Sequence, residues 1–242
     1  MKAGARTPVR AQGACAAVLA AAAWLATGAF AQGAGAGASA AAGGAHAARF
    51  AELCASCHGP RGTSEMPLVP HLGGQPSFYA ITQLFLFREG RRNDHPLAGA
   101  MAAIAKGMSD ADLRGFSEFI ATLPPPAAPT AAGANSAGAR DAARFERGRA
   151  LAFQHHCTGC HGTDLAGGRQ VPRIGGQRED YLLIALKGFR AGVRLGYTNA
   201  MGEALAGLGE AQIDDLAHFL AHAVAAPAAA APVASAASSM QR

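Results

Sequence analysis

Residues 54–58 read Cys-Ala-Ser-Cys-His, and residues 157–161 read Cys-Thr-Gly-Cys-His. The C-x-x-C-H pattern is the attachment signature of c-type haem, in which two thiols bond to the porphyrin vinyl groups and the histidine binds the iron. One copy of so short a motif can arise by chance, but two copies followed by matching sequence exclude coincidence. The sequence predicts two covalent haem c groups, with thiol and proximal ligands Cys54, Cys57, His58, Cys157, Cys160 and His161.

The chain contains an internal repeat whose two copies lie about 102 residues apart. Residues 70–75 (PHLGGQ) match residues 172–177 (PRIGGQ), and residues 87–92 (FREGRR) match residues 189–194 (FRAGVR). A unit of about 80 residues is small for burying a core unaided, so a covalent haem would act as core filler and as staple. We therefore expect two tandem units, each built around one haem.

Shifts in composition divide the chain into six expected segments. The first has three cations, an Ala/Leu/Val-rich run and an Ala-Phe-Ala cleavage site, which is the pattern of a signal peptide. A membrane anchor is the alternative, but the apolar run of about 16 residues is shorter than the roughly 20 that a spanning helix needs. The segments are a signal peptide (1–31), a disordered lead-in (32–44), domain 1 (45–123), a Pro/Ala-rich linker (124–139), domain 2 (140–225) and a disordered tail (226–242).

Charge and cysteine usage narrow the function classes. The formal net charge of +5 falls to +2 once Lys2, Arg6 and Arg10 leave with the signal peptide, so we expect no nucleic-acid partner. Of five cysteines, one lies in the leader and four lie in the haem motifs, which leaves none for a disulfide. Export and haem attachment outside the inner membrane predict a periplasmic protein without a transmembrane anchor after cleavage.

Periodicity predicts helices throughout and almost no strand. A short helix leads into each haem motif, with Phe50 and Phe153 each four residues before the first cysteine. A middle helix is expected from near Ser77 in the first unit and from near Arg178 in the second. The last helix of the first unit begins after a capping-box sequence at Ser109, whereas its counterpart begins after a weaker cap at Gly209.

The sixth ligand of each iron must come from outside the haem motif. Met101 and Met201 occupy matching repeat positions, each just before the last expected helix. A thioether is a soft, neutral donor that favours ferrous iron, so we expect both methionines to bind iron rather than only to fill the core. Met66 and Met108 have no methionine counterpart in the second unit, and we expect them to pack.

Two further pairs support the haems in this interpretation. The carbonyls of Pro70 and Pro172 are expected to accept the ring N–H of the proximal histidines, the alternative being that these prolines only stiffen loops. Arg92 and Arg194 are expected to pair with haem propionates, the alternative being solvated charges at helix ends. The other histidines are expected to be solvated or partly buried side chains rather than iron ligands: His71, His95, His155, His156, His218 and His222.

Residues 45–225 resemble the cytochrome c4 family, the dihaem class I c-type cytochromes. The resemblance rests on the paired C-x-x-C-H-G, the P-x-L/I-G-G-Q loop followed by tyrosine, the F-R-x-G-x-R segment and the methionine before the final helix. It implies an all-α fold of two tandem class I cytochrome c domains related by a pseudo-twofold axis. It also implies a periplasmic carrier that takes electrons from a quinol-oxidising complex and passes them to a terminal oxidase or reductase.

Three function classes follow. We expect a non-enzymatic electron carrier, because two six-coordinate irons offer no substrate site. Its expected partners are membrane-bound respiratory complexes and other redox proteins, with peripheral association at the membrane. One alternative is a dihaem enzyme of the peroxidase or thiosulfate-oxidising type, which would need an open iron position or a spare cysteine. The other is an electron-accepting subunit held by a periplasmic dehydrogenase.

Overall fold

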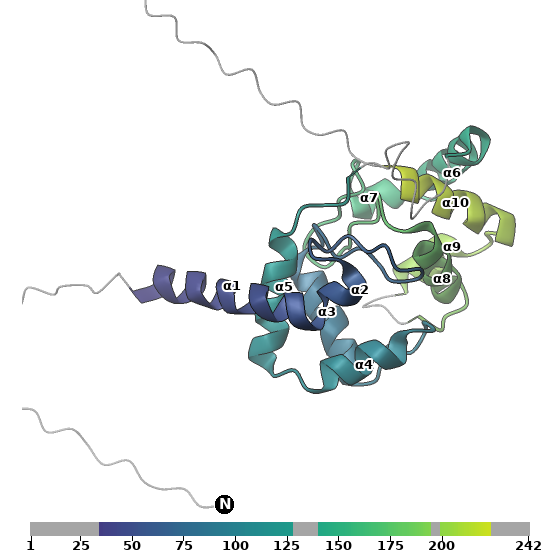
Figure 1. Ribbon diagram of the computed structural model, residues 1–242. Helices are drawn as coiled ribbons and strands as arrows, with labels where there is room; N and C mark the ends of the chain where they lie inside the picture. Colours follow the sequence, from purple (N-terminus) through teal and green to yellow (C-terminus); the bar gives the residue numbers. More distant parts are fainter. Residues whose placement is uncertain (1–33, 128–139, 195–198, 224–242) are drawn as a thin grey trace, which may run out of the picture.

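A computed structural model describes residues 34–127, 140–194 and 199–223 of the chain. Within these ranges every regular element is a helix, and the β-structure is a single isolated bridge between Gly168 and Val171. Figure 1 shows the helices gathered into two neighbouring groups, the earlier one coloured from purple to teal and the later one from teal to yellow. The expected all-α, two-unit fold is confirmed.

The first unit packs its helices around an apolar core. Phe50, Leu84, Phe87, Phe116 and Ile120 lie in this core. The last helix contacts both the first and the middle helix, so it closes the unit. The five helices are α1 (Ala34–Leu53), α2 (Ala55–His58), α3 (Ser77–Arg88), α4 (Ala98–Lys106) and α5 (Asp110–Thr122).

The second unit repeats this order with a tighter crossing of its first and last helices. A Cβ atom on Gly148 would lie 2.1 Å from the carbonyl oxygen of Asp215 and 2.6 Å from the Cβ of Phe219. Only glycine therefore permits this approach, and Figure 1 shows the two helices side by side. The helices are α6 (Ala142–Gln154), α7 (Cys157–His161), α8 (Glu179–Arg190), α9 (Ala200–Leu205) and α10 (Glu210–His222).

The expected helix starts agree with the structure. Ser109 caps α5: its Oγ accepts from the Asp112 N–H at 3.1 Å, and the Asp112 carboxylate accepts from the Ser109 N–H at 3.0 Å. At α10 the N–H of Gly209 donates to the Gln212 side chain at 2.9 Å. Glycine has no side chain to return that bond, which makes this the weaker cap of the two.

One segment boundary differs from the sequence-based expectation. Helix α1 begins at Ala34, whereas residues 32–44 were expected to form a disordered lead-in. Alanine has the highest intrinsic helix propensity, so an alanine-rich segment directly before a packed helix can extend it. The expected signal peptide and the expected tail lie outside the described residues, as does the expected linker from residue 128 onward. The described start of the linker packs on domain 1, where a Cβ atom on Gly73 would lie 2.1 Å from the carbonyl oxygen of Pro124.

The two units pack through a pair of equivalent glutamines. Gln75 donates to the Arg173 carbonyl at 2.9 Å and accepts from the Arg173 N–H at 3.1 Å. Gln177 makes the same two bonds with His71, at 2.9 and 2.7 Å. Because these residues are equivalent in the repeat, the contact is the self-complementary one that a pseudo-twofold axis produces. The last residue of the P-x-L/I-G-G-Q loop thus joins the domains.

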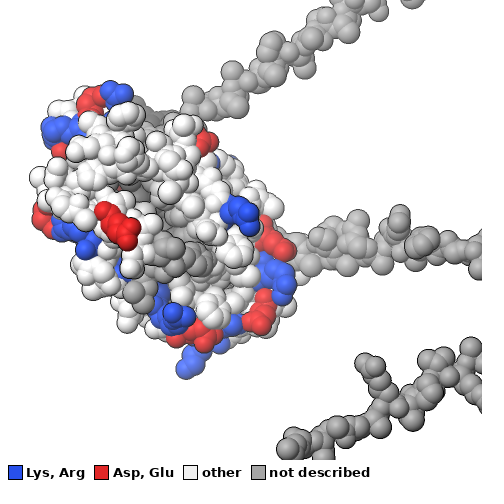
Figure 2. Space-filling model, turned by 180° about the vertical axis from the view of Figure 1, so that it is seen from behind, with Lys and Arg blue, Asp and Glu red and all other residues white. Residues whose placement is uncertain are grey.

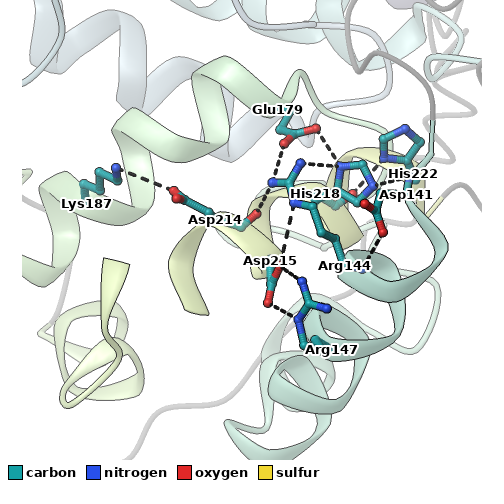
Figure 3. Close-up of polar contacts among 9 residues, drawn as sticks. All are labelled: Asp141, Arg144, Arg147, Glu179, Lys187, Asp214, Asp215, His218 and His222. Atoms are coloured by element: carbon teal, nitrogen blue, oxygen red, sulfur yellow. Dashed lines mark hydrogen bonds and ion pairs between the residues drawn. The ribbon is translucent and has the colours of Figure 1, made fainter. Parts of the chain in front are cut away.

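A polar network ties α6, α8 and α10 together in the second unit (Figure 3). Arg147 forms a two-bond pair with Asp215, and Arg144 donates to Glu179 at 2.9 Å. His218 is fully buried, which corrects the expectation of a solvated or partly buried side chain. Its Nδ1 faces Glu179 at 2.9 Å and its Nε2 accepts from the Asp141 N–H at 3.0 Å. Both ring nitrogens are therefore engaged, and this cluster is structural rather than a metal site.

Candidate haem sites

Both haem motifs open into one cavity of about 590 Å³. The cavity is lined by the thiol pairs of both motifs and by apolar side chains from the two cores. A few polar side chains line it where the two units meet. The histidine and methionine expected to bind each iron all line this cavity: His58, Met101, His161 and Met201. The tertiary structure thus brings together the residues that the sequence singled out in two separate units.

The glycine after each motif ends the short helix that carries the thiols and the histidine. Gly59 and Gly162 have φ angles of 78° and 81°, in the region that side chains disfavour. A Cβ on Gly59 would also lie 2.1 Å from the Thr63 carbonyl oxygen. This turn sends the chain back across the histidine, so that the Pro70 loop can reach the imidazole.

The imidazoles of His58 and His161 are buried and held by backbone carbonyls. The Nδ1 of His58 lies 2.9 Å from the Pro70 oxygen, and the Nδ1 of His161 lies 2.9 Å from the Pro172 oxygen. The hydrogen bond expected from the sequence is thus present in both units. Burial lowers the pKa of both histidines, so the rings are neutral. With Nδ1–H donating, Nε2 keeps its lone pair, which is the form that ligates a metal.

The methionines differ in their surroundings. Met101 and Met201 are half-buried at the edges of the two cores and line the cavity. Met108 and its counterpart Leu208 are buried, in agreement with the expected packing role, although Met108 also lines the cavity. Met66 is exposed at the cavity mouth, so it does not pack as expected.

Arg92 and Arg194 meet at the junction of the two units, and both are buried. The alternative of solvated helix-end charges is therefore wrong. The Tyr181 hydroxyl accepts from Arg92 at 2.8 Å and from Arg194 at 3.0 Å. Burial opposes ionisation of Tyr181, but Arg194 and Arg92 outweigh it and lower its pKa to about 8. Asp94, almost fully buried, accepts from Arg194 at 2.9 Å.

Sequence reasoning did not assign roles to Tyr79, Tyr181 or Asp94. The two tyrosines could have been found, because they match in the repeat and each follows a P-x-L/I-G-G-Q loop. Burial raises the pKa of Tyr79, and the positive charge of Arg194 opposes that rise. Asp94 carried no such signal, since the segment that follows Arg194 contains no acid at the matching positions.

The residues present fit two haem groups. The cavity offers paired thiols, buried neutral imidazoles and apolar walls, which are the donors and surroundings that c-type haem needs. The Nε of Arg92 is buried without a hydrogen-bond partner among the described residues. A buried guanidinium N–H without a partner needs a hydrogen-bond acceptor, and a carboxylate oxygen of the porphyrin would supply one.

Four of the other histidines have structural partners, and His156 is exposed, as expected. His71 is buried at the domain interface, contrary to expectation, and its Nδ1 accepts from the Ser64 N–H at 2.9 Å. The Nδ1 of His155 bonds to the Ala204 carbonyl at 2.8 Å, and that of His95 accepts from the Leu97 N–H at 3.0 Å. The Nδ1 of His222 lies 2.8 Å from the His218 carbonyl oxygen.

Comparison with known proteins agrees with this geometry. The family model for cytochrome c matches residues 41–124 and 145–223. A cytochrome c4 from Azotobacter vinelandii is 31% identical over 158 residues, which are 60% of this chain and 70% of that protein. A thiosulfate dehydrogenase electron acceptor from Stutzerimonas stutzeri (strain A1501) is 30% identical over 178 residues, covering 71% of this chain and 79% of that protein.

Solved structures show the same two-unit arrangement. The crystal structure of reduced recombinant cytochrome c4 from Pseudomonas stutzeri superimposes with a TM-score of 0.62 at 26% identity. The match covers 74% of this chain and 97% of that one. The likeness therefore extends over both units and their packing.

Two tandem helical units that present paired thiols and a buried histidine to a shared cavity define a dihaem c-type cytochrome. The chain belongs to the cytochrome c4 family and carries two covalently bound haem c groups. Within the ranges that the structure describes, no helix has the length and apolar character needed to cross a bilayer.

Proposed function

We propose that the chain is a periplasmic, non-enzymatic electron carrier that shuttles single electrons between respiratory components, such as a quinol-oxidising complex and a terminal oxidase or reductase. The observation that carries this proposal is the shared cavity, which is lined by the histidine and the methionine of both units. Haems bound in one cavity can exchange electrons directly. The protein supplies orientation, a dry pocket and electrostatics, while the haem supplies the redox chemistry.

In this proposal His58 and Met101 are the axial ligands of the first haem, and His161 and Met201 those of the second. The Pro70 and Pro172 carbonyls fix the ring orientation of the histidines. Arg92 and Arg194 hold porphyrin carboxylates at the junction. Each residue acts by holding its group in place: no side chain needs to gain or lose a proton during electron transfer.

The surface charge supports brief docking with partner proteins. On the face shown in Figure 2, acidic and basic side chains lie beside one another, mostly around the edge. A mixed surface of this kind lacks the single-signed patch of a nucleic-acid-binding protein. Redox encounters are typically small in area and transient, which such a face allows.

A second candidate is the electron acceptor of a periplasmic thiosulfate dehydrogenase. The observation in its favour is the relative of that name, which matches over 71% of this chain. The two candidates share the same haem chemistry and differ in which protein donates the electron. Under both, the expected signal peptide would direct the chain to the periplasm.

The visible spectrum of the dithionite-reduced protein, recorded before and after addition of carbon monoxide, tests whether a histidine and a methionine occupy both axial positions of each iron. We expect sharp low-spin bands that carbon monoxide does not shift, because both irons have two protein ligands. Met101→Ala and Met201→Ala should each open one haem, so that half of the signal shifts. Phe153→Ala, at an exposed residue that does not line the cavity, is the control and should leave the spectrum unchanged. A rapid shift of half the wild-type signal would instead indicate an open site and an enzyme.

The donor is tested by stopped-flow reduction of the oxidised protein. One reaction uses a purified quinol-oxidising complex with quinol, and the other uses thiosulfate dehydrogenase with thiosulfate. Faster reduction by the first supports the respiratory carrier. Faster reduction by the second, with copurification of the dehydrogenase, supports the acceptor and contradicts the preferred proposal.

A further inference from the structure

A groove of about 720 Å³ lies between α3 and α5 on the first unit. The two helices pack against each other and lie side by side in Figure 1. Ile81, Leu86 and Leu113 give the groove an apolar lining. Phe85 also lines it and is 38% exposed. An exposed aromatic ring beside a recessed apolar surface is typical of the centre of a protein interface.

The groove is also positively charged. Four charged residues line it, and two of these compensate each other, because Arg88 donates to Asp110 at 2.8 Å. The other two, Arg91 and Arg114, are exposed and form no ion pair within the part of the chain that the structure describes. An apolar lining with two uncompensated cations is complementary to a surface that carries both apolar and acidic side chains.

The equivalent surface of the second unit is built differently. Three groove residues are replaced there by residues of another class: Phe85 by Lys187, Arg91 by Val193 and Arg114 by Asp214. Lys187 lies 2.8 Å from Glu210 and 3.6 Å from Asp214, so these charges compensate one another. Because α8 and α10 pack against each other without the three groove residues, the packing of the two helices does not require them. This difference between the units indicates a binding role.

The groove and the haem cavity share one side chain of the first unit. Gln83 lines both, and its Oε1 accepts from Arg92 Nη1 at 2.8 Å. Arg92 is one of the two arginines proposed above to hold porphyrin carboxylates. A protein bound in the groove would therefore be separated from the haem cavity by a single side chain, which suits a partner that exchanges electrons with the first unit.

We propose that the α3–α5 groove is the docking site for an acidic, amphipathic helix on the redox protein that exchanges electrons with the haem of the first unit. The inference rests on the carrier function proposed above and names the chemistry of its partner. Along α3 the lining runs from Ile81 to Arg88, about two helical turns, which suits the apolar face of a short helix. Acidic side chains beside that face would pair with Arg91 and Arg114. A flat bilayer would reach the exposed ring but not the apolar lining between the helices.

Isothermal titration calorimetry of the haem-loaded protein tests this with two synthetic peptides. One is a short amphipathic helix of leucine and glutamate, and the other has lysine in place of glutamate. The glutamate peptide should bind, and more weakly in about 0.5 M salt, whereas the lysine peptide should not. Exchanging the groove residues for those of the second unit (Phe85→Lys, Arg91→Val and Arg114→Asp) should weaken binding about tenfold. Arg91→Gln with Arg114→Gln alters exposed side chains alone, so folding is not at risk, and should weaken it about fivefold.

The matched control is Arg61→Gln with Lys106→Gln, which removes two exposed cations outside the groove and should leave the affinity unchanged. Equal binding of the two peptides, or equal affinity in the control and the groove variants, would contradict the inference. It is also wrong if the glutamate peptide fails to bind while the groove variants lose cosedimentation with phosphatidylglycerol vesicles or dissociate a wild-type dimer. The carbon monoxide test reports on the carrier function independently: an unshifted spectrum without peptide binding would reject the docking site alone.

Discussion

Phe50 and Phe153 stand at the same place in the two units, four residues before the first haem cysteine, yet one is buried and the other is not. Phe50 is 1% exposed and Phe153 is 80% exposed. Helix α1 runs through Leu53 directly to Cys54, whereas α6 ends at Gln154. His156 then adopts a left-handed conformation with a φ of 53°. Because of this break, α6 is rotated about its own axis relative to the haem motif. A residue four positions before the first cysteine therefore faces the core in the first unit and solvent in the second.

The second unit fills the corresponding space with a different residue. Phe50 contacts Phe119 with ring centroids 5.2 Å apart, and in the second unit Phe145 contacts Phe219 at 5.1 Å. Phe119 and Phe219 are true counterparts, but Phe50 and Phe145 are not. The aromatic contact between first and last helix is therefore retained, and the residue that makes it depends on the register of the helix. Equivalence in a repeat indicates the fold but does not by itself assign the core.

Replacing the two phenylalanines should give the largest difference between the units. Phe50→Ala leaves a cavity in the first core and should lower the free energy of unfolding by about 3–5 kcal/mol. Phe153→Ala removes an exposed ring and should change it by less than about 0.5 kcal/mol. Denaturant unfolding followed by circular dichroism measures both. Equal losses would show that α6 has the same register as α1.

Acid should weaken the interface through His71, whose counterpart in the second unit is Arg173. Burial, with help from Arg178, lowers the pKa of His71 to about 4, while an unfolded histidine titrates near 6.5. The unfolded state then binds more protons between these values, so the free energy of unfolding falls from pH 6.5 to 4 and levels off below. The loss should reach about 3 kcal/mol.

The same unfolding series with His71→Asn isolates this contribution. Asparagine keeps an acceptor for the Ser64 N–H but has no proton to gain in this range. The free energy of unfolding of the His71→Asn variant should therefore fall less steeply between pH 6.5 and 4 than that of the wild type. Parallel curves for the two proteins would show that His71 titrates normally in the folded state.

The paired glutamines should give the smallest difference between the units. Each alanine substitution leaves two backbone groups at the interface unpaired and should cost about 2 kcal/mol. Gln177→Ala should cost about 1 kcal/mol more than Gln75→Ala, because the Gln177 oxygen also accepts from the Arg178 N–H at 2.9 Å. Calorimetry should show the domains melting less cooperatively. Gln154→Ala, on an exposed site, is the control; an equal loss there would contradict the interface role.

Much of the fold and of the site follows from local sequence. The haem motifs, the glycine after each, the capping sequence at Ser109 and the apolar spacing of α5 and α10 act over a few residues, so their consequences can be predicted without a structure. The proline carbonyls could be placed as well, because the loop that returns over each histidine has nearly the same length in both units. These are the features that the repeat shares.

The tertiary structure alone decided how the units differ and how they meet. The exposure of Phe153 depends on one left-handed residue, and the roles of Gln75, Gln177 and Asp94 depend on partners about a hundred positions away. A side chain that bonds across an interface has no periodic or spacing signal of its own. Its partner is set by the packing of whole domains, which is a sum of many weak contacts rather than a local preference. The sequence by itself determined the two haem-binding units, and their packing determined the asymmetry between them.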